Sequence, residues 1–146
     1  CADAGVPMPN VVSCDMWVQA YAGTGNPGPT FVVDEMKRLG FDAKIEFLSG
    51  SSHELLPPLL RGANRSFDLI TVDGDHSRDG ARADLLDVVD HLRLGGMLAF
   101  DDINHPQHTY LGQVWREVMN NRAGMETYEN PRNNTGIAAT IRFRLA

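Results

Sequence analysis

Two kinds of hydrophobic pattern alternate along the chain. Short apolar runs rich in β-branched residues predict strands, and stretches in which apolar residues recur every three or four positions predict amphipathic helices. Such alternation is typical of βαβ units around a largely parallel sheet. Five strands are predicted, at residues 10–15, 43–48, 67–72, 96–100 and 136–144. Residues 126–129 give a weaker signal for a sixth.

Three amphipathic helices are predicted between these strands. The first has Thr30 as N-cap and ends at Gly40, where a left-handed cap is favoured. The apolar stripes of the three helices are Phe31, Val32, Met36 and Leu39; Ala81, Leu85, Val88, Val89 and Leu92; and Leu111, Val114, Trp115, Val118 and Met119. On the second helix the face opposite the stripe carries acidic residues, namely Asp79, Asp84, Asp87 and Asp90.

Prolines and glycines interrupt the pattern in two places. Ser51 and Glu54 are spaced as a capping box, but Pro57 and Pro58 predict two short turns in place of one regular helix. Residues 23–29, with the sequence GTGNPGP, predict a surface loop that could act as a lid.

Composition narrows the class of protein. A length of 146 residues predicts one domain (residues 1–146), and 42% hydrophobic content supports a packed core. The net charge of −6 disfavours nucleic acid and anionic membranes as partners, and no apolar run reaches the roughly 20 residues of a spanning helix. Two cysteines, Cys1 and Cys14, match no disulfide or zinc pattern and favour a reducing, cytoplasmic setting.

Carboxylates follow three of the predicted strands. Asp15 ends the first, Asp73 follows the third with Asp75 and His76 close behind, and Asp101 with Asp102 ends the fourth. Ligands of open α/β sheets bind beyond the carboxyl ends of the strands, and an oxygen-rich cluster there suits Mg²⁺ or Ca²⁺. Each aspartate can equally satisfy free backbone amides at a strand end or helix start. The five histidines taken singly indicate surface or packing positions.

The segment FDLITVDGDHSRDGARADLLDVVDHLRLGGMLAFDDI, residues 67–103, resembles the second half of a class I S-adenosylmethionine-dependent methyltransferase. It is most similar to the small metal-dependent O-methyltransferase-like branch, and VVSCDMW and NNTGIAATIRFR are similar to that family's second strand and closing hairpin. The resemblance implies an α/β, Rossmann-like fold. Its sheet would be mostly parallel, with helices on both faces and an antiparallel C-terminal hairpin.

The resemblance also implies roles for individual residues. Asp15 would accept hydrogen bonds from the ribose of S-adenosylmethionine, with Trp17 beside it, and Ser51 and Ser52 would contact the adenine. The metal ligands, which would hold Mg²⁺ or another divalent cation, would be Asp73, Asp101 and Asp102, and Asp73 would also border the cofactor. His76 would be the general base, with Asp75 as the competing candidate. The acceptor would be a hydroxyl of a small molecule or a sugar.

The sequence also departs from the family pattern. The family's first strand and glycine-rich turn have no match, and residues 1–9 resemble the end of the helix that follows that turn, so we expect the natural protein to extend upstream. A metal-independent methyltransferase and a non-catalytic methyltransferase-like binding or assembly module are the alternatives, and a homo-oligomer is compatible with either. A receiver-like signalling domain fits the aspartates but not the closing hairpin.

Overall fold

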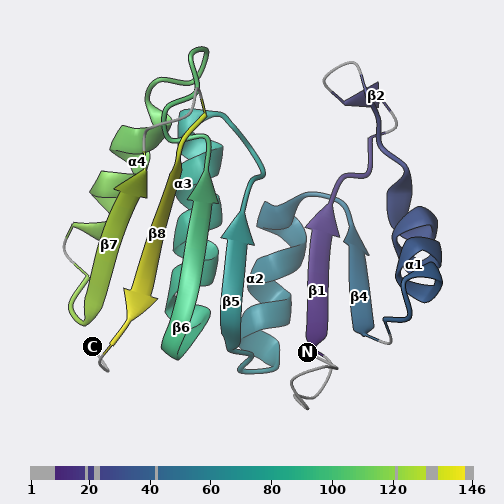
Figure 1. Ribbon diagram of the computed structural model, residues 1–146. Coiled ribbons are helices and arrows are strands. Elements are labelled where there is room, and N and C mark those ends of the chain that lie inside the picture. The colour runs from purple at the N-terminus through teal and green to yellow at the C-terminus, as the bar shows by residue number, and fades with distance from the viewer. Residues whose placement is uncertain are drawn as a thin grey trace. The chain divides into compact units, whose positions relative to one another are not determined.

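The computed structural model describes residues 9–18, 20–21, 24–41, 43–120, 122–130 and 135–143. The chain divides into two compact units, Cys1–Leu55 and Leu56–Ala146. Figure 1 labels the elements. The strands and helices, in chain order, are β1 (Asn10–Asp15), β2 (Ala20–Tyr21), β3 (Thr24–Gly25), α1 (Gly28–Arg38), β4 (Lys44–Ser49), α2 (Ser52–Gly62), β5 (Phe67–Val72), α3 (Arg78–Val88), the 3-10 turn Val89–His91, β6 (Leu92–Asp101), α4 (Leu111–Met119), β7 (Met125–Asn130) and β8 (Ile137–Arg142).

The first unit is built on a parallel pair of strands. β1 pairs with β4 in a register that sets Asp15 opposite Ser49, so both strands end at the same edge. Residues 10–15 form the strand as predicted, whereas the second strand lies one residue later than predicted. A parallel pair of this kind needs a crossover, and α1 supplies it.

Two predictions for the crossover were wrong in detail. α1 begins at Gly28, and its N-cap is Pro27, three residues before the predicted N-cap Thr30. A proline in the first helical turn loses no intrahelical hydrogen bond and presets φ, which explains the earlier start. In the predicted loop 23–29, Thr24–Gly25 pairs with Ala20–Tyr21; Gly23 lies outside the described residues. Gly40 has a φ of +76°, confirming the left-handed cap.

The prediction of two short turns around Pro57 and Pro58 was also wrong. α2 runs without a break from Ser52 to Gly62 and contains both prolines. It begins directly after Ser51, whose carbonyl accepts hydrogen bonds from the amides of Glu54 (3.2 Å) and Leu55 (3.1 Å). Each proline removes one backbone donor, but its fixed φ of about −65° is itself helical, so packing can hold the helix together.

The second unit contains a four-stranded mixed sheet in the order β5-β6-β8-β7. β5 and β6 are parallel, and β8 inserts antiparallel between β6 and β7, which confirms the predicted C-terminal hairpin and its weak sixth strand. β6 extends four residues further toward the N-terminus than predicted, beginning at Leu92 directly after the 3-10 turn. Within the described residues β5 pairs only with β6 and β1 only with β4, so each has one unpaired edge.

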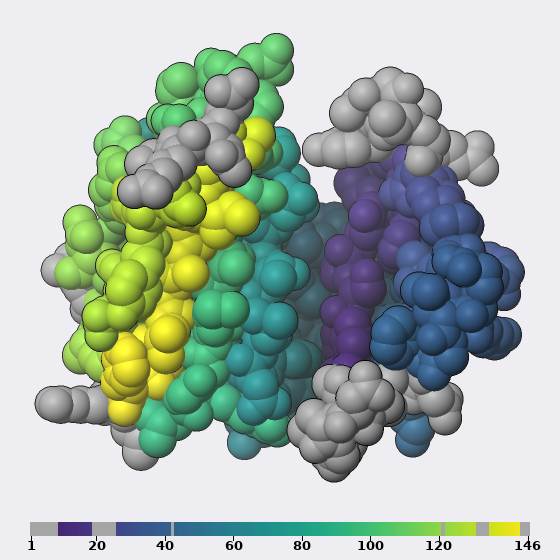
Figure 2. Space-filling model, in the orientation of Figure 1, coloured from purple at the N-terminus to yellow at the C-terminus, as the bar shows by residue number. Residues whose placement is uncertain are grey.

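One face of this sheet holds the core of the unit. Alternate residues of β6, Leu98 and Phe100, are buried together with Trp115 of α4, whose ring stacks on Phe100 at a centroid distance of 6.0 Å. α3 and α4 both lie on this face (Figure 1). The opposite face carries Met97 and Leu69, which are 41% and 55% exposed, and the strands are visible there in Figure 2.

The predicted acidic face of the second helix needs one correction. Asp84 of α3 is buried at 4% exposure and its Oδ2 accepts a hydrogen bond from the Asp75 amide at 3.2 Å. A buried carboxylate is tolerated when backbone donors satisfy it. The helix α4 and its apolar stripe match the prediction. None of the helices in the described residues is long and apolar enough to cross a membrane.

Candidate functional site

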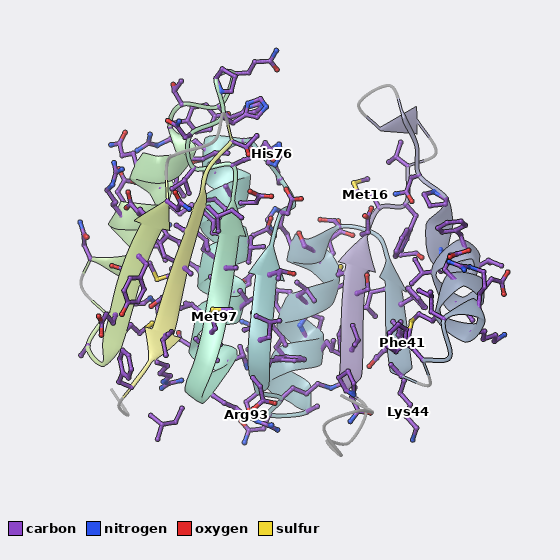
Figure 3. The ribbon with its side chains drawn as sticks, in the orientation of Figure 1. Met16, Phe41, Lys44, His76, Arg93 and Met97 are labelled. Atoms are coloured by element: carbon purple, nitrogen blue, oxygen red, sulfur yellow. The ribbon has the colours of Figure 1, made fainter. Side chains whose placement is uncertain are left out.

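The loop that leaves β5 carries the first group of predicted site residues. Asp73 and His76 lie in this loop, and His76 appears in Figure 3 at the carboxyl-terminal end of the strand. Gly74 does not have a positive φ, contrary to what a sharp glycine turn would need. It is required for space, because a Cβ there would lie 2.7 Å from Oδ2 of Asp84. The loop is therefore held close to the first turns of α3.

Asp75 takes part in the start of α3. Its Oδ1 accepts a hydrogen bond from the Ser77 amide at 2.8 Å, and Ser77 is the N-cap of the helix. A Cβ at Gly80 would lie 2.0 Å from Asp75 Oδ2, so the carboxylate lies against the helix backbone. This geometry fits the structural alternative for Asp75, in which its carboxylate accepts from a backbone amide at the start of a helix.

The end of β6 supplies the second group. Asp101 is its last residue, and its Oδ1 accepts a hydrogen bond from the Asp102 amide at 2.8 Å. Asp102 has a φ of +62°, which turns its carboxylate away from the direction that an extended backbone would give. The Asp102 carbonyl accepts a hydrogen bond from the His105 amide at 3.0 Å, so the left-handed residue is fixed on both sides.

These two loops bring three predicted residues together. His76 Nε2 lies 3.3 Å from Asp73 Oδ1 and 3.4 Å from Asp102 Oδ2. One ligand atom from each of the three residues lies within 4.8 Å of the others. Two carboxylates at this spacing fit a divalent cation, and the His76 imidazole lies within hydrogen-bond distance of both. Asp101 lies outside this group, and its role as a metal ligand stays a prediction.

Exposure differs among the three residues. The side chain of Asp73 is 61% exposed, whereas those of His76 and Asp102 are 22% and 13% exposed. The cluster is therefore open to solvent on the Asp73 side and closed on the Asp102 side. A ligand arriving from solvent meets the Asp73 carboxylate first.

The loop between β6 and α4 adds residues that sequence reasoning missed. His105 and His108 lie with ring centroids 6.4 Å and 5.2 Å from that of His76, and 4.9 Å from each other. The Tyr110 hydroxyl donates a hydrogen bond to the His76 carbonyl at 2.7 Å and lies 3.1 Å from His108 Nδ1. The signal in the sequence was the group HPQHTY, which places two histidines three residues apart shortly after FDDIN.

In the first unit the predicted cofactor residues also meet at one edge. Asp15 ends β1, and its carbonyl accepts a hydrogen bond from the Gly50 amide at 3.0 Å, directly before Ser51. Ser51 and Ser52 form the start of α2. The start of α2 thus lies directly after the residue whose amide bonds to Asp15, and the Asp15 side chain is exposed.

The conformation of Trp17 shapes this edge. Trp17 has a φ of +51°, its amide donates to Asp15 Oδ1 at 2.7 Å, and its indole donates to the Leu48 carbonyl at 3.3 Å. Its ring meets Phe47 edge-on at 5.7 Å. A left-handed aromatic residue is uncommon and is held here by three contacts. Asp15 Oδ2 accepts no hydrogen bond from the residues that the structure describes, and the role of Asp15 and Trp17 in cofactor binding stays a prediction.

Comparison with known proteins identifies the family. A family model described as a methyltransferase domain matches residues 2–103. The chain belongs to this methyltransferase family. The match runs through both loops of the acidic cluster and through the Asp15 edge, and it confirms the class of protein that the DGDHS, LGG and DDI motifs suggested. Among curated proteins none matches the sequence.

Solved structures that resemble this chain show its fold class. The apo TDP-rhamnose 3'-O-methyltransferase of calicheamicin biosynthesis is 16% identical with a TM-score of 0.59, over 91% of this chain and 58% of its own. The O-methyltransferase NovP is 15% identical with a TM-score of 0.64, over 98% and 75%. MycE of the mycinamycin pathway, solved with Mg, SAH and mycinamycin VI, is 17% identical with a TM-score of 0.55, over 94% and 45%. The chain therefore has the α/β, Rossmann-like fold that the sequence predicted, and it spans little more than half the length of the first of these structures.

Proposed function

We propose that this protein transfers a methyl group from S-adenosylmethionine to a hydroxyl oxygen of a small molecule or a sugar, with help from a divalent cation. The observation that carries the proposal is the convergence of Asp73, His76 and Asp102 at the carboxyl ends of two parallel strands in a chain of the methyltransferase family. The solved structures named above include a TDP-rhamnose 3'-O-methyltransferase and an enzyme solved with mycinamycin VI, which supports a sugar or another small molecule as the acceptor.

In this proposal the first unit binds the cofactor. Asp15 accepts hydrogen bonds from the two ribose hydroxyls with the carboxylate that the Trp17 amide already orients. Ser51 and Ser52, at the start of α2, contact the adenine with amides and hydroxyls. When bound, S-adenosylmethionine supplies an electrophilic methyl group on a sulfonium sulfur. Asp15 then fixes the nucleoside so that this methyl group presents one geometry to the acceptor.

The acidic cluster of the second unit prepares the acceptor. Asp73 and Asp102 would hold the cation, which when bound would lower the pKa of the acceptor hydroxyl and orient it. Because both carboxylates can only accept, His76 directs its Nε2–H toward them and keeps a lone pair on Nδ1. Nδ1 can take the hydroxyl proton while the acceptor oxygen forms its bond to the methyl carbon; the carbon–sulfur bond breaks in the same step, and its electron pair leaves with S-adenosylhomocysteine.

Calorimetric titration of S-adenosylhomocysteine into the full-length protein tests the cofactor site. We expect micromolar binding that weakens about 10- to 100-fold in Asp15→Ala, because a charged hydrogen-bond acceptor contributes about 1.5–3 kcal/mol. Asp34→Ala, which removes an exposed carboxylate from α1 of the same unit, is the matched control and keeps the affinity. Absence of binding by the full-length protein would overturn the proposal in favour of a non-catalytic module.

Turnover with a panel of sugar and phenol acceptors tests the cluster. Asp102→Asn should lower Mg²⁺-dependent methyl transfer by two orders of magnitude or more while leaving the affinity for S-adenosylhomocysteine unchanged. If activity persists in excess chelator, the metal-independent variant of the reaction is correct and the carboxylates have a structural role.

A further inference from the structure

A buried carboxylate packs against the loop that carries Asp73 and His76. This carboxylate belongs to Asp84 of α3, which is 4% exposed; Asp84 and Thr140 are the buried polar side chains among the described residues. The other buried residues of α3 are small or apolar, namely Gly80, Ala81, Leu85 and Val88. A carboxylate is rarely buried unless other groups bind it. The contacts of Asp84 therefore indicate what it does.

Asp84 contacts the middle of the loop. Its Oδ2 accepts a hydrogen bond from the Asp75 amide at 3.2 Å, and a Cβ on Gly74 would lie 2.7 Å from the same oxygen. Gly74 and Asp75 are the two residues between Asp73 and His76. Side chains do not tolerate a Cβ contact this short, so glycine at position 74 lets the carboxylate reach the backbone of the loop.

The contact between the loop and the helix is reciprocal. Asp75 directs its own carboxylate toward α3, where a Cβ on Gly80 would lie 2.0 Å from Asp75 Oδ2. Asp75 Oδ1 accepts a hydrogen bond from the Ser77 amide at 2.8 Å, and the Ser77 hydroxyl accepts one from the Gly80 amide at 3.1 Å. One carboxylate from each side thus occupies the space that a glycine leaves on the other. A shift of the loop relative to α3 would break both contacts.

A second element holds the end of the loop. The Tyr110 hydroxyl donates a hydrogen bond to the His76 carbonyl at 2.7 Å, and Tyr110 belongs to the connection between β6 and α4 that also contains Asp102. Asp73 has less support of its own, because its side chain is 61% exposed. The place of the Asp73 carboxylate therefore depends on the backbone that Asp84 holds.

We propose that Asp84 is a positioning residue for the candidate site. By holding the Asp75 amide it fixes the loop backbone, and thereby the approach of Asp73 Oδ1 to His76 Nε2, which is 3.3 Å in the structure. Asp84 is not among the three residues whose ligand atoms converge, so it acts through the loop. Its effect on the loop is independent of the proposed function, whereas its effect on methyl transfer rests on that function.

A purely stabilising role for Asp84 gives different results. In that case Asp84→Ala would lower the free energy of unfolding, while the folded variant would keep the loop and the activity of the parent. Asp84→Asn separates the two roles further, because its amide oxygen can still accept a hydrogen bond from the Asp75 amide. A positioning role predicts that asparagine restores what alanine loses.

Hydrogen exchange of the Asp75 amide in the full-length protein, followed by NMR, tests the contact itself. We expect this amide to exchange about 10-fold faster or more in Asp84→Ala, because an exposed amide without its acceptor exchanges freely with water. Asp84→Asn should stay within a few-fold of the parent. Asp79→Ala, which removes an exposed aspartate from the first turn of the same helix, is the matched control and should keep the parental rate. An unchanged rate in Asp84→Ala would overturn the proposal, whether or not the protein transfers methyl groups.

Turnover and its Mg²⁺ dependence test the consequence for the reaction. Asp84→Ala should lower kcat about 10- to 100-fold and raise the Mg²⁺ concentration that gives half the maximal rate, while the affinity for S-adenosylhomocysteine stays parental. Asp84→Asn should recover most of the rate. A folded Asp84→Ala with parental kcat, or an Asp84→Asn as slow as Asp84→Ala, would overturn the proposal. If the parent itself transfers no methyl group, the proposed function fails and the exchange rates decide about Asp84.

Gly74→Ala approaches the same contact from the loop. Its methyl group would lie 2.7 Å from Asp84 Oδ2, so the carboxylate must move and exchange at the Asp75 amide should become faster. In the double variant with Asp84→Ala the clash is gone, and we expect exchange and turnover no worse than in Asp84→Ala alone. Effects that multiply in the double variant would show that the two residues act independently, which overturns the proposal. Circular dichroism reports whether each variant is folded; if Asp84→Ala is not, Gly74→Ala and Asp84→Asn give the same test.

Discussion

Asp102 combines a functional side chain with an unfavourable backbone. Its φ of +62° lies in the left-handed region, where an L-residue other than glycine costs roughly 1–2 kcal/mol and where aspartate and asparagine are the best tolerated. Two hydrogen bonds hold it there, one from its own amide to Asp101 Oδ1 and one from the His105 amide to its carbonyl. The strain directs a nearly buried carboxylate toward His76.

Substitution of Asp102 should separate strain from side-chain chemistry. We expect the free energy of unfolding of Asp102→Gly to be about 1 kcal/mol higher than that of Asp102→Ala. The reason is that glycine adopts a positive φ without a steric cost and alanine does not. Asp102→Asn should lie close to the parent. Urea unfolding followed by circular dichroism measures the order. The same pair of changes at Asp73, whose φ is not positive, should give the reverse order, with alanine the more stable. Equal stability of the Asp102 glycine and alanine variants would show that the backbone is not strained.

Glycines near the site act mainly through the space they leave. Gly74 and Gly80 have ordinary backbone angles, yet a Cβ on either would collide with a carboxylate, of Asp84 and Asp75 respectively. These contacts fix the loop after β5 against the first turns of α3. The position of Asp73 thus depends on two residues that carry no side chain.

At the scale of elements, β6 has one face in the hydrophobic core and the other face exposed to solvent. Successive side chains point to opposite faces of a sheet, so Leu98 enters the core while Met97 stays 41% exposed. Figure 3 shows Met97 on the face of the sheet toward the viewer. Arg116 of α4 adds a bidentate ion pair with Glu129 of β7, and the hydrogen bond to that carboxylate raises the pKa of the guanidinium.

Leu98 and Met97 are neighbours in β6, and truncating them should have unequal effects on the free energy of unfolding. Leu98→Ala should lower the free energy of unfolding by about 2–5 kcal/mol, because it removes buried methyl groups and leaves a cavity. Met97→Ala should cost less than about 1 kcal/mol, since much of that side chain is already solvated. Chemical denaturation of both variants gives the comparison. A loss at Met97 as large as that at Leu98 would mean that the exposed face is covered when the protein is in solution.

For the molecule as a whole, acidic residues outnumber basic ones, 19 to 13. The net charge is −6, and Asp73 and Asp102 stand together at the carboxyl ends of β5 and β6. Like charges brought together in the folded chain and separated in the unfolded chain oppose folding. A divalent cation that binds only the folded cluster reverses the effect.

Thermal unfolding with and without Mg²⁺ tests this coupling. At about 100 times the dissociation constant, a cation that binds the native state alone adds roughly 2.7 kcal/mol. For a chain of this size that should raise Tm by about 5–10 °C. Asp73→Asn should lose most of the increase, whereas Asp68→Asn, an exposed aspartate paired with Arg93 at the other end of β5, should keep it. An increase that is the same in Asp73→Asn and in the parent would place the ion elsewhere.

Much of the fold could be predicted because its signals are local. Hydrophobic period fixed β1, β5 and α4 almost to the residue, since burial on one face requires period two in strands and about 3.6 in helices. Predictions failed where packing overrides local preference: two prolines lie inside α2, and Asp84 is buried on a helix face that reads as solvent-exposed. The donor that satisfies Asp84 is the Asp75 amide, which reaches it only because the loop after β5 packs against α3.

The sequence by itself determined the methyltransferase family and the order of the elements. It also determined that Asp15, Asp73 and Asp102 lie at strand ends. Both follow from motif spacing and periodicity, which are properties of neighbouring residues. Only the tertiary structure decided which of these side chains meet. It joined His76 to Asp73 and Asp102 and turned Asp101 toward a backbone amide. It also brought His105 and His108 beside them. Such contacts depend on backbone angles and on loops packing across some 30 residues of chain, and a one-dimensional pattern does not specify either.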